Sequence, residues 1–420
     1  MVAMDGASSL RRTFFSLGNS NFRLYFIGQA ISLSGTWMQT IGQSWLVLQI
    51  TGSGTALGLV TALQFLPILL LGPLGGVIAD RFPKRTILYA TQSAAGVLAL
   101  VLGALVEAGT VRLWMVGVLA ACLGLVNTVD NPTRQTFVFE MVGKEQIQNA
   151  VSLNSVLVNV ARVVGPAIAG VLIASVGLAS CFFVNAASYI SVLIALRMMH
   201  AEQLRPAPLV ARAGGQLRDA FRYVRSSPVL RSALVMMAII GTLSYEFQVV
   251  LPLFAQFTLG GNAGTYAALT VAMGVGSVIG GLYTASRKTV VPRMLIRAAF
   301  LFGAVILAAA IAPNLPWAIA ALVLVGIFSI NFLSLGNTIL QLESVPEMRG
   351  RVMALWMVAF LGSTPIGGPI IGWIGEHAGP RWGLGIGGLA AIIAGTLGLR
   401  SLGRGSQVTG HPPVDGTRPR

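Results

Sequence analysis

Long apolar segments separated by short polar breaks run along almost the whole chain. Each segment exceeds the roughly 20 residues that a helix needs to cross about 30 Å of hydrocarbon. We expect helices rather than barrel strands, because the alternation of apolar and polar residues that marks a membrane β-barrel is absent. The predicted spans are 22–49, 54–79, 86–107, 112–138, 147–175, 178–199, 229–257, 263–285, 292–312, 316–341, 351–375 and 380–402.

The longest polar break covers residues 200–228 and separates six spans from six. Its segment QLRDAFRYVRSSP has an apolar face that predicts a short amphipathic helix on the membrane surface, with apolar positions 217, 220, 221 and 224. The predicted organisation is an N-terminal tail at 1–21, a six-helix bundle at 22–199, a central loop at 200–228, a second bundle at 229–402 and a C-terminal tail at 403–420.

Composition supports lipid as the solvent. The 420 residues are 55% hydrophobic and only 10% charged, whereas a soluble protein has about 25% charged residues. A net charge of +15 would suggest nucleic acid in a soluble chain. Here the basic residues lie mostly between apolar spans, so we predict no nucleic-acid partner. Cys122 and Cys181 lie within spans and indicate neither a disulfide framework nor a metal site.

The distribution of Lys and Arg predicts the orientation. If the N-terminus is cytoplasmic, the outer loops contain only Arg112 and Arg381, and Arg162 lies within a span. The remaining 25 of the 28 basic residues then lie at or near the cytoplasmic face. Because cytoplasmic loops are enriched in Lys and Arg, both termini are predicted to be cytoplasmic.

The two halves of the chain are related in sequence. EMVGKEQIQNAVSL begins at Glu140, and ESVPEMRGRVMALW begins at Glu343, an offset of 203 residues. The same offset aligns GPAIAG with GPIIG, and duplication of a six-span unit is common in transporters. The small residues of these motifs predict tight helix packing, with a kink at the first proline; they are Gly165, Pro166, Gly170, Gly368 and Pro369.

The loop after the second span reads GGVIADRFPKR (75–85). It resembles the signature loop of the major facilitator superfamily, G-x-x-x-D-R-x-G-R-R/K, with Pro83 in place of the usual glycine. The matching residues are Gly76, Asp80, Arg81, Lys84 and Arg85. A simple positively charged turn would not need Asp80. The resemblance implies an all-α integral membrane protein with the major facilitator fold, about twelve transmembrane helices in two six-helix bundles. It also implies that Asp80 latches the cytoplasmic side at a helix N-terminus of the other half, where an anion is favoured.

Three further runs resemble the bacterial enterobactin-exporter branch of that superfamily: WLVLQITGSGTALGLV (45–60), NPTRQTFVFEMV (131–142) and NVARVVGPAIAG (159–170). This resemblance implies a monomeric exporter in the bacterial inner membrane. We expect a proton gradient to supply energy and no cofactor to be bound. No G-x-x-x-x-G-K-[ST] loop is present, and no HExxH or HxxxH spacing supports a membrane enzyme.

Polar residues form one-sided stripes on five predicted spans, which suits helices around a shared watery cavity. Interhelical hydrogen bonding is the alternative for each individual residue. The substrate-cavity candidates are Trp37, Gln39, Gln43, Asn159, Arg162, Tyr245, Gln248 and Asn331.

Three ionisable residues within spans are expensive in lipid unless they are paired, hydrated or neutral. Glu246 is a proton-coupling candidate, and Arg162, which keeps its proton, needs a carboxylate, a carbonyl lining or an anionic substrate. For both, a structural ion pair is the alternative. Asp130 is the second proton-coupling candidate. A local pair with Arg134, four residues later, is the favoured interpretation, while contacts with Arg162 or the signature loop stay open.

These features predict a secondary transporter that exports an amphipathic small molecule, such as a siderophore, drug or secondary metabolite, by proton-coupled alternating access. An uptake carrier on the same fold would differ only in the chemistry of its cavity. A non-transporting receptor or scaffold would not need charges near the membrane midplane.

Overall fold

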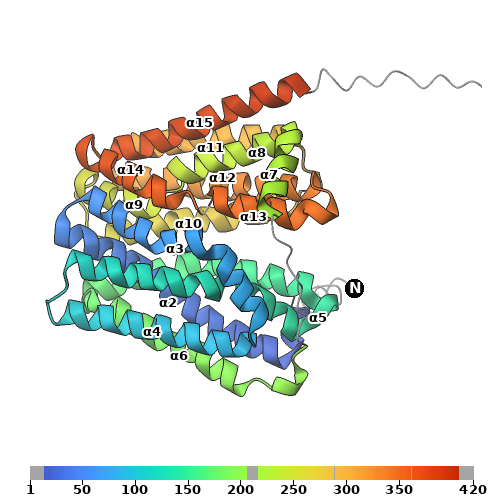
Figure 1. The fold of residues 1–420 in the computed structure, drawn as a ribbon. Helices are drawn as coiled ribbons and strands as arrows, with labels where there is room; N and C mark the ends of the chain where they lie inside the picture. Colours follow the sequence, from blue (N-terminus) through green and yellow to red (C-terminus); the bar gives the residue numbers. More distant parts are fainter. Residues whose placement is uncertain (1–13, 206–215, 288, 361, 406–420) are drawn as a thin grey trace, which may run out of the picture.

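The structure is a computed structural model that describes residues 14–205, 216–287, 289–360 and 362–405, and every regular element in these ranges is a helix (Figure 1). Most of both predicted tails and the middle of the central loop lie outside the described residues. The N-terminal half contains the short helices η1 (Phe15–Gly18) and η2 (Ala201–Gln203). Its long helices are α2 (Ser20–Thr51), α3 (Gly54–Arg81), α4 (Lys84–Glu107), α5 (Leu113–Ser175) and α6 (Ala179–Met198).

Helix α5 contains two membrane crossings. Its 63 residues would extend roughly 95 Å as one straight helix, about three times the hydrocarbon thickness. The chain turns at Gly143, whose φ of 73° lies in the left-handed region that favours glycine. The predicted fourth and fifth spans are therefore both present. Helix continues on both sides of Gly143, where the sequence suggested a polar loop.

The C-terminal half begins with α7 (Gln216–Ser226). Two of its six spans are each divided into shorter helices. The elements are α8 (Pro228–Leu243), α9 (Phe247–Leu253), the π-helix η3 (Phe254–Thr258), α10 (Ala263–Ala285), α11 (Pro292–Ala310), α12 (Leu315–Leu342), α13 (Pro346–Phe360), α14 (Thr364–His377) and α15 (Pro380–Gly405). The amphipathic helix predicted in the central loop is α7. Its Ala220 and Val224 are buried, whereas Phe221 is exposed.

The spans predicted at 229–257 and 351–375 are present, at Pro228–Thr258 and Pro346–His377, but each is divided into shorter helices. In the seventh span, the Ser244 hydroxyl donates to the Gly387 carbonyl at 2.6 Å, and the Tyr245 hydroxyl donates to the Ser329 carbonyl at 2.6 Å. In the eleventh, Pro365 lies in the first turn of α14, where proline has no N–H to continue a preceding helix. The break in the seventh span is thus accompanied by hydrogen bonds to other helices, and the break in the eleventh by a proline.

Ten helical stretches are long and apolar enough to cross a membrane. The stretch Leu113–Ser175 crosses twice, and α2 adds one more crossing, although its buried glutamines at 29, 39 and 43 lower its hydropathy. Twelve crossings therefore fall within the described ranges, in two six-helix bundles, as predicted.

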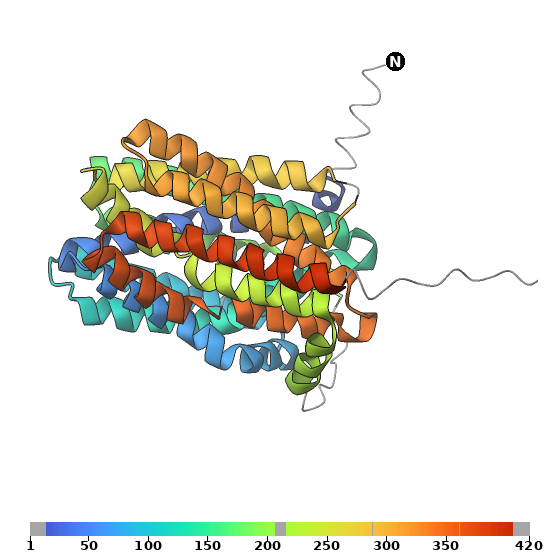
Figure 2. The same cartoon turned by 90° about the horizontal axis from the view of Figure 1, so that it is seen from above.

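The two bundles lie side by side, with the N-terminal half coloured blue to green and the C-terminal half yellow-green to red (Figures 1 and 2). We call the end with the turns after α2 and α14 the distal end, and the end where α2 begins the proximal end. Small residues bring the halves together. A Cβ atom on Gly58 of α3 would lie 2.6 Å from the carbonyl carbon of Gly368 on α14, and one on Gly170 of α5 would lie 3.0 Å from the Ala267 Cβ on α10. The duplicated glycine motifs therefore lie at close helix contacts.

Candidate functional site

A polar pocket of about 50 Å³ lies inside the N-terminal bundle, and Gln248 of the other half reaches its wall. This volume has room for a few water molecules and is far too small for a siderophore or drug. Gln39 and Gln43, two substrate-cavity candidates from α2, also line it. The pocket therefore places these glutamines beside a water-sized space.

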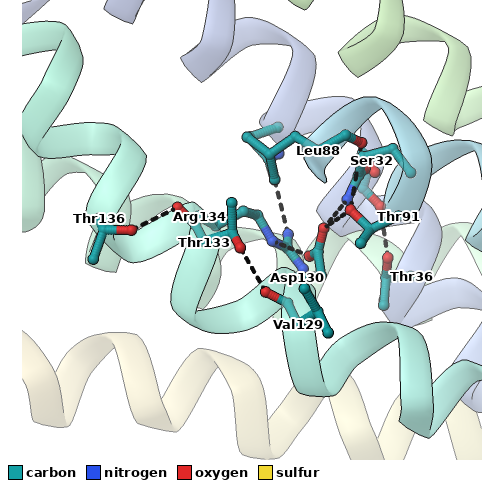
Figure 3. A network of polar contacts seen from close by, with 11 residues as sticks. Ser32, Thr36, Leu88, Thr91, Val129, Asp130, Thr133, Arg134 and Thr136 are labelled. Carbon is teal, nitrogen blue, oxygen red and sulfur yellow. Dashed lines mark hydrogen bonds and ion pairs between the residues drawn. The ribbon is translucent and has the colours of Figure 1, made fainter. Parts of the chain in front are cut away.

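Asp130 and Arg134 form one wall of this pocket (Figure 3). Asp130 is 1% exposed, and its Oδ2 pairs with Arg134 Nε at 2.5 Å. Its Oδ1 accepts hydrogen bonds from Thr91 Oγ1 at 2.6 Å and Gln92 Nε2 at 2.8 Å, and Arg134 Nη1 donates to Gln29 Oε1 at 3.0 Å. This Asp130–Arg134 ion pair is the local contact that was expected from the four-residue spacing of the two residues. Arg134, counted among the basic residues near the cytoplasmic face, belongs to this buried network.

Several polar partners of this network were not among the predicted site residues. Gln43 Nε2 donates to Gln64 Oε1 at 3.1 Å, and Asn185 Nδ2 donates to Gln39 Oε1 at 2.6 Å. Gln39 and Gln43 thus both line the pocket and connect neighbouring helices. The available signal was the short polar run around Gln92 within the predicted third span, which forms no stripe.

Arg162 lies apart from that pocket, on α5. Its guanidinium carbon is 4.9 Å from the centre of the Trp37 ring on α2, and Tyr245 of the other half is close enough to interact with it electrostatically. Its Nε is buried without a hydrogen-bond acceptor, and Arg162 takes part in neither of the two ion pairs found among the described residues. The structural ion pair that was the alternative for Arg162 is therefore not observed.

Aromatic rings surround Tyr245 at the break in the seventh span. Its ring centre is 4.8 Å from that of Phe360, and Trp356 stacks on Phe360 at 5.8 Å. Of the remaining candidates, Asn331 is buried on α12 with its Oδ1 unpartnered within the described chain. Asn159 is half-buried and donates to the Ser155 carbonyl of its own helix at 2.8 Å.

Glu246 occupies the position before α9, within the same break, and is 3% exposed. Its carboxylate lies against the first turns of α14. A Cβ atom on Gly367 would lie 2.9 Å from Oε1, and one on Gly368 would lie 3.5 Å from Oε2. Thr364 interacts with the carboxylate, while Oε1 has no hydrogen-bond donor among the described residues. Glu246 is therefore a buried acid at the contact between the halves.

Lys84 and Arg85 of the signature loop contact other residues of the N-terminal half. Lys84 forms a buried ion pair with Glu140 at 2.6 Å, and Arg85 Nη2 donates to the Arg197 carbonyl at 3.4 Å. Asp80 is half-buried at the end of α3, Gly76 lies one turn before it, and Arg81 is exposed. Glu140, the first residue of the duplicated segment, was not identified as a partner of the loop. Among the described residues, no group of three His, Cys, Asp or Glu side chains is placed to hold a metal ion.

A family model described as "Transmembrane secretion effector" matches residues 12–408, which is almost the whole chain. The chain belongs to the transmembrane secretion effector family. It is therefore a major facilitator transporter rather than an enzyme, and it works in a lipid bilayer on a small-molecule substrate.

Curated relatives of this secretion effector include several transporters of low identity. The staphyloferrin A transporter of Staphylococcus aureus is 25% identical over 358 residues, which cover 82% of this chain and 87% of the relative. The enterobactin exporter EntS of Salmonella typhi is 24% identical over 406 residues, covering 94% and 95%. The multidrug efflux pump Tap of Mycolicibacterium fortuitum is 24% identical over 365 residues, covering 82% and 88%.

Solved structures confirm the fold of this secretion effector. A bacterial homologue of the human lysosomal transporter Spinster has a TM-score of 0.73 at 14% identity, covering 91% of this chain and 96% of that one. A bacterial homologue of the iron transporter ferroportin has a TM-score of 0.68 at 16% identity, covering 91% and 98%. The predicted major facilitator fold is therefore confirmed.

Proposed function

We propose that this protein exports an amphipathic small molecule, such as a siderophore, drug or secondary metabolite, by proton-coupled alternating access. It acts as a monomer in the bacterial inner membrane, with both termini and the proximal end cytoplasmic. The relatives support this proposal, since they include an enterobactin exporter and a multidrug efflux pump.

The observation that carries the coupling proposal is the position of Glu246. It is an acid buried at the contact between the two halves, and its Oε1 lacks a donor within the described residues. Ionisable residues inside a membrane domain usually mark ion or substrate pathways. Protonation turns an acceptor-only carboxylate into a hydrogen-bond donor, so a proton on Glu246 changes its contacts with α14. Asp130, beside the water-sized pocket, is the second proposed proton site.

The inter-half contacts support an alternating-access cycle. In this structure, α3 packs against α14 and α5 packs against α10 across the boundary between the halves. The glycine contacts Gly58–Gly368 and Gly54–Gly372 lie toward the distal end. Opening that end requires α3 and α14 to separate. We propose that closing the proximal end then brings Asp80 to a helix N-terminus of the C-terminal half.

Flux in proteoliposomes under an imposed pH gradient tests this function, with a panel of catecholate siderophores and lipophilic cations. We expect at least one compound to move against the proton flow at a rate that falls when the gradient is collapsed. Gradient-independent flux, or no flux for the whole panel, would remove the support for coupled export. Accumulation with the proton flow would instead favour the uptake carrier.

A further inference from the structure

We propose that Arg162 binds the anionic group of a planar aromatic substrate, and that the rings beside it bind the aromatic body. The transported molecule is then an aromatic acid or phenolate rather than a lipophilic cation. This inference rests on the proposed transport function and names the substrate class of that function.

Arg162 carries a positive charge that no ion pair among the described residues balances. Arg134, a half-buried arginine on the same long helix, has Asp130 as its counter-charge at 2.5 Å. Arg162 forms no ion pair in the described ranges, and its buried Nε has no acceptor there. A guanidinium keeps its proton at physiological pH, and an unpaired charge inside the membrane costs several kcal/mol. The charge and the unpartnered Nε–H therefore call for an anion during the transport cycle.

No acidic residue of the region supplies that anion. Glu246 directly follows Tyr245, but its carboxylate lies against Gly367 and Gly368 of α14. Among the titratable groups of the described residues, Tyr245 is the one that interacts electrostatically with Arg162. The guanidinium carbon lies over the Trp37 ring, 4.9 Å from its centre, and the buried Nε–H has no acceptor among the described residues, so it can donate to a carboxylate or phenolate.

The surroundings of Arg162 also supply aromatic surface from both halves. Trp37 contacts it from α2, and Tyr245 of the other half lies within electrostatic range of it. Tyr245 contacts Phe360 at 4.8 Å, and Phe360 stacks on Trp356 at 5.8 Å. The buried Trp356 Nε1 is a second donor without an acceptor among the described residues. Arg162 Nε and Trp356 Nε1 are thus two unpartnered donors with aromatic rings between them. Such an arrangement suits a planar ligand that carries negative charge.

Binding of three ligands with the same rings and different charges tests this proposal on the purified full chain, by isothermal titration calorimetry. The probes are 2-naphthoate, the neutral 2-naphthamide and the cationic 2-(aminomethyl)naphthalene. We expect the wild-type protein to prefer naphthoate. Arg162→Gln should weaken naphthoate binding at least about tenfold, the usual scale for losing a hydrogen bond to a charged group, and leave naphthamide binding within about twofold. Arg162→Lys should be intermediate, because lysine keeps the charge without the planar fork.

Arg112→Gln is the matched control, because it removes an exposed arginine just before α5 and should behave as wild type. The wild-type ranking of the three probes needs no variant, so it decides the question even if Arg162→Gln does not fold. Equal or stronger binding of the amine or the amide, absence of naphthoate binding, or unchanged naphthoate affinity in Arg162→Gln would overturn the proposal. Charge-selective binding without coupled flux would defeat the export function alone. Coupled export of cations unaffected by Arg162→Gln would defeat this inference alone.

Discussion

The carboxylate of Glu376, at the end of α14 in the C-terminal half, accepts a hydrogen bond of 2.7 Å from Ser53 Oγ, just before α3 in the N-terminal half. The same oxygen accepts the backbone N–H of Thr55 at 2.9 Å. Because an anion is favoured at a helix N-terminus, Glu376 completes the first turn of α3 from across the boundary between the halves. It thereby links the halves at the distal end, where the glycine contacts bring α3 and α14 together.

Replacing Glu376 should weaken this distal closure. In Glu376→Gln the charge is lost, and an exposed charged contact is worth about 1 kcal/mol at most, so the population with an open distal end should rise up to about fivefold. Spin labels at Thr110 and Pro313, in distal turns of the two halves, report the change as longer distances in a double electron–electron resonance experiment on a cysteine-free background. Glu107→Gln, which alters another exposed acid at the end of α4, is the control. An unchanged distance distribution in Glu376→Gln would show that the contact does not stabilise closure.

A side chain at Gly58 should prevent the halves from closing. The Cβ atom of Gly58→Ala would lie 2.6 Å from the Gly368 carbonyl carbon and 2.8 Å from Pro369 Cα, and backbone cannot give way as a flexible side chain can. Overpacking of this kind costs about 1–3 kcal/mol, here only in the distal-closed state. We expect transport to fall and the same spin-label pair to move apart. Gly385→Ala, where an added Cβ meets nothing within 4 Å, should transport normally. Normal transport by Gly58→Ala would contradict the assigned role of this contact.

Variants of the Asp130–Arg134 pair distinguish a structural role of this pair from a role in proton coupling. Asp130→Asn leaves Arg134 without its counter-charge and should destabilise the protein by about 3 kcal/mol. Asp130→Asn combined with Arg134→Gln removes both charges and should restore most of the thermal stability in detergent. Because the carboxylate lies beside the water-sized pocket, we expect gradient-driven flux to stay lost in the double variant. If the double variant recovers both its stability and its coupled flux, the pair has a structural role only.

The pH dependence of transport should depend on Glu246. Glu246→Gln introduces an uncharged side chain that has nearly the same shape but cannot exchange a proton. We expect gradient-driven flux to fall at least about tenfold, an effect of about 1.4 kcal/mol or more, while downhill exchange continues and becomes insensitive to pH. Glu343→Gln, at an exposed proximal acid, serves as the control. If Glu246→Gln shows unchanged proton-coupled flux, Glu246 is not the coupling residue.

The number of crossings and their order could be predicted from the sequence, because lipid requires each span to be a long apolar helix. The Asp130–Arg134 contact was also predictable, since residues four apart meet on one face of a helix. The duplicated motifs pointed to close packing at Gly368, where α14 meets α3.

Features that depend on contacts between distant segments could not be predicted in this way. The break at Ser244–Glu246 is accompanied by hydrogen bonds to α12 and α15, which the local apolar pattern does not show. Gln92 reaches Asp130 from another helix, 38 residues away in sequence. Glu376 looked like an ordinary polar residue at the end of a span, and its partners lie more than 300 residues away.

Substrate-induced proton movement tests the central claim of coupled export most directly. Proteoliposomes loaded with a pH-sensitive dye receive the tightest-binding compound from the outside, with no gradient imposed. Since substrate and protons move in opposite directions in the proposed cycle, substrate entry should drive protons out, and the lumen should become alkaline in the wild type but not in Glu246→Gln. Acidification of the lumen would show that substrate and protons move together, and an unchanged luminal pH during substrate entry would show that transport is not coupled to protons.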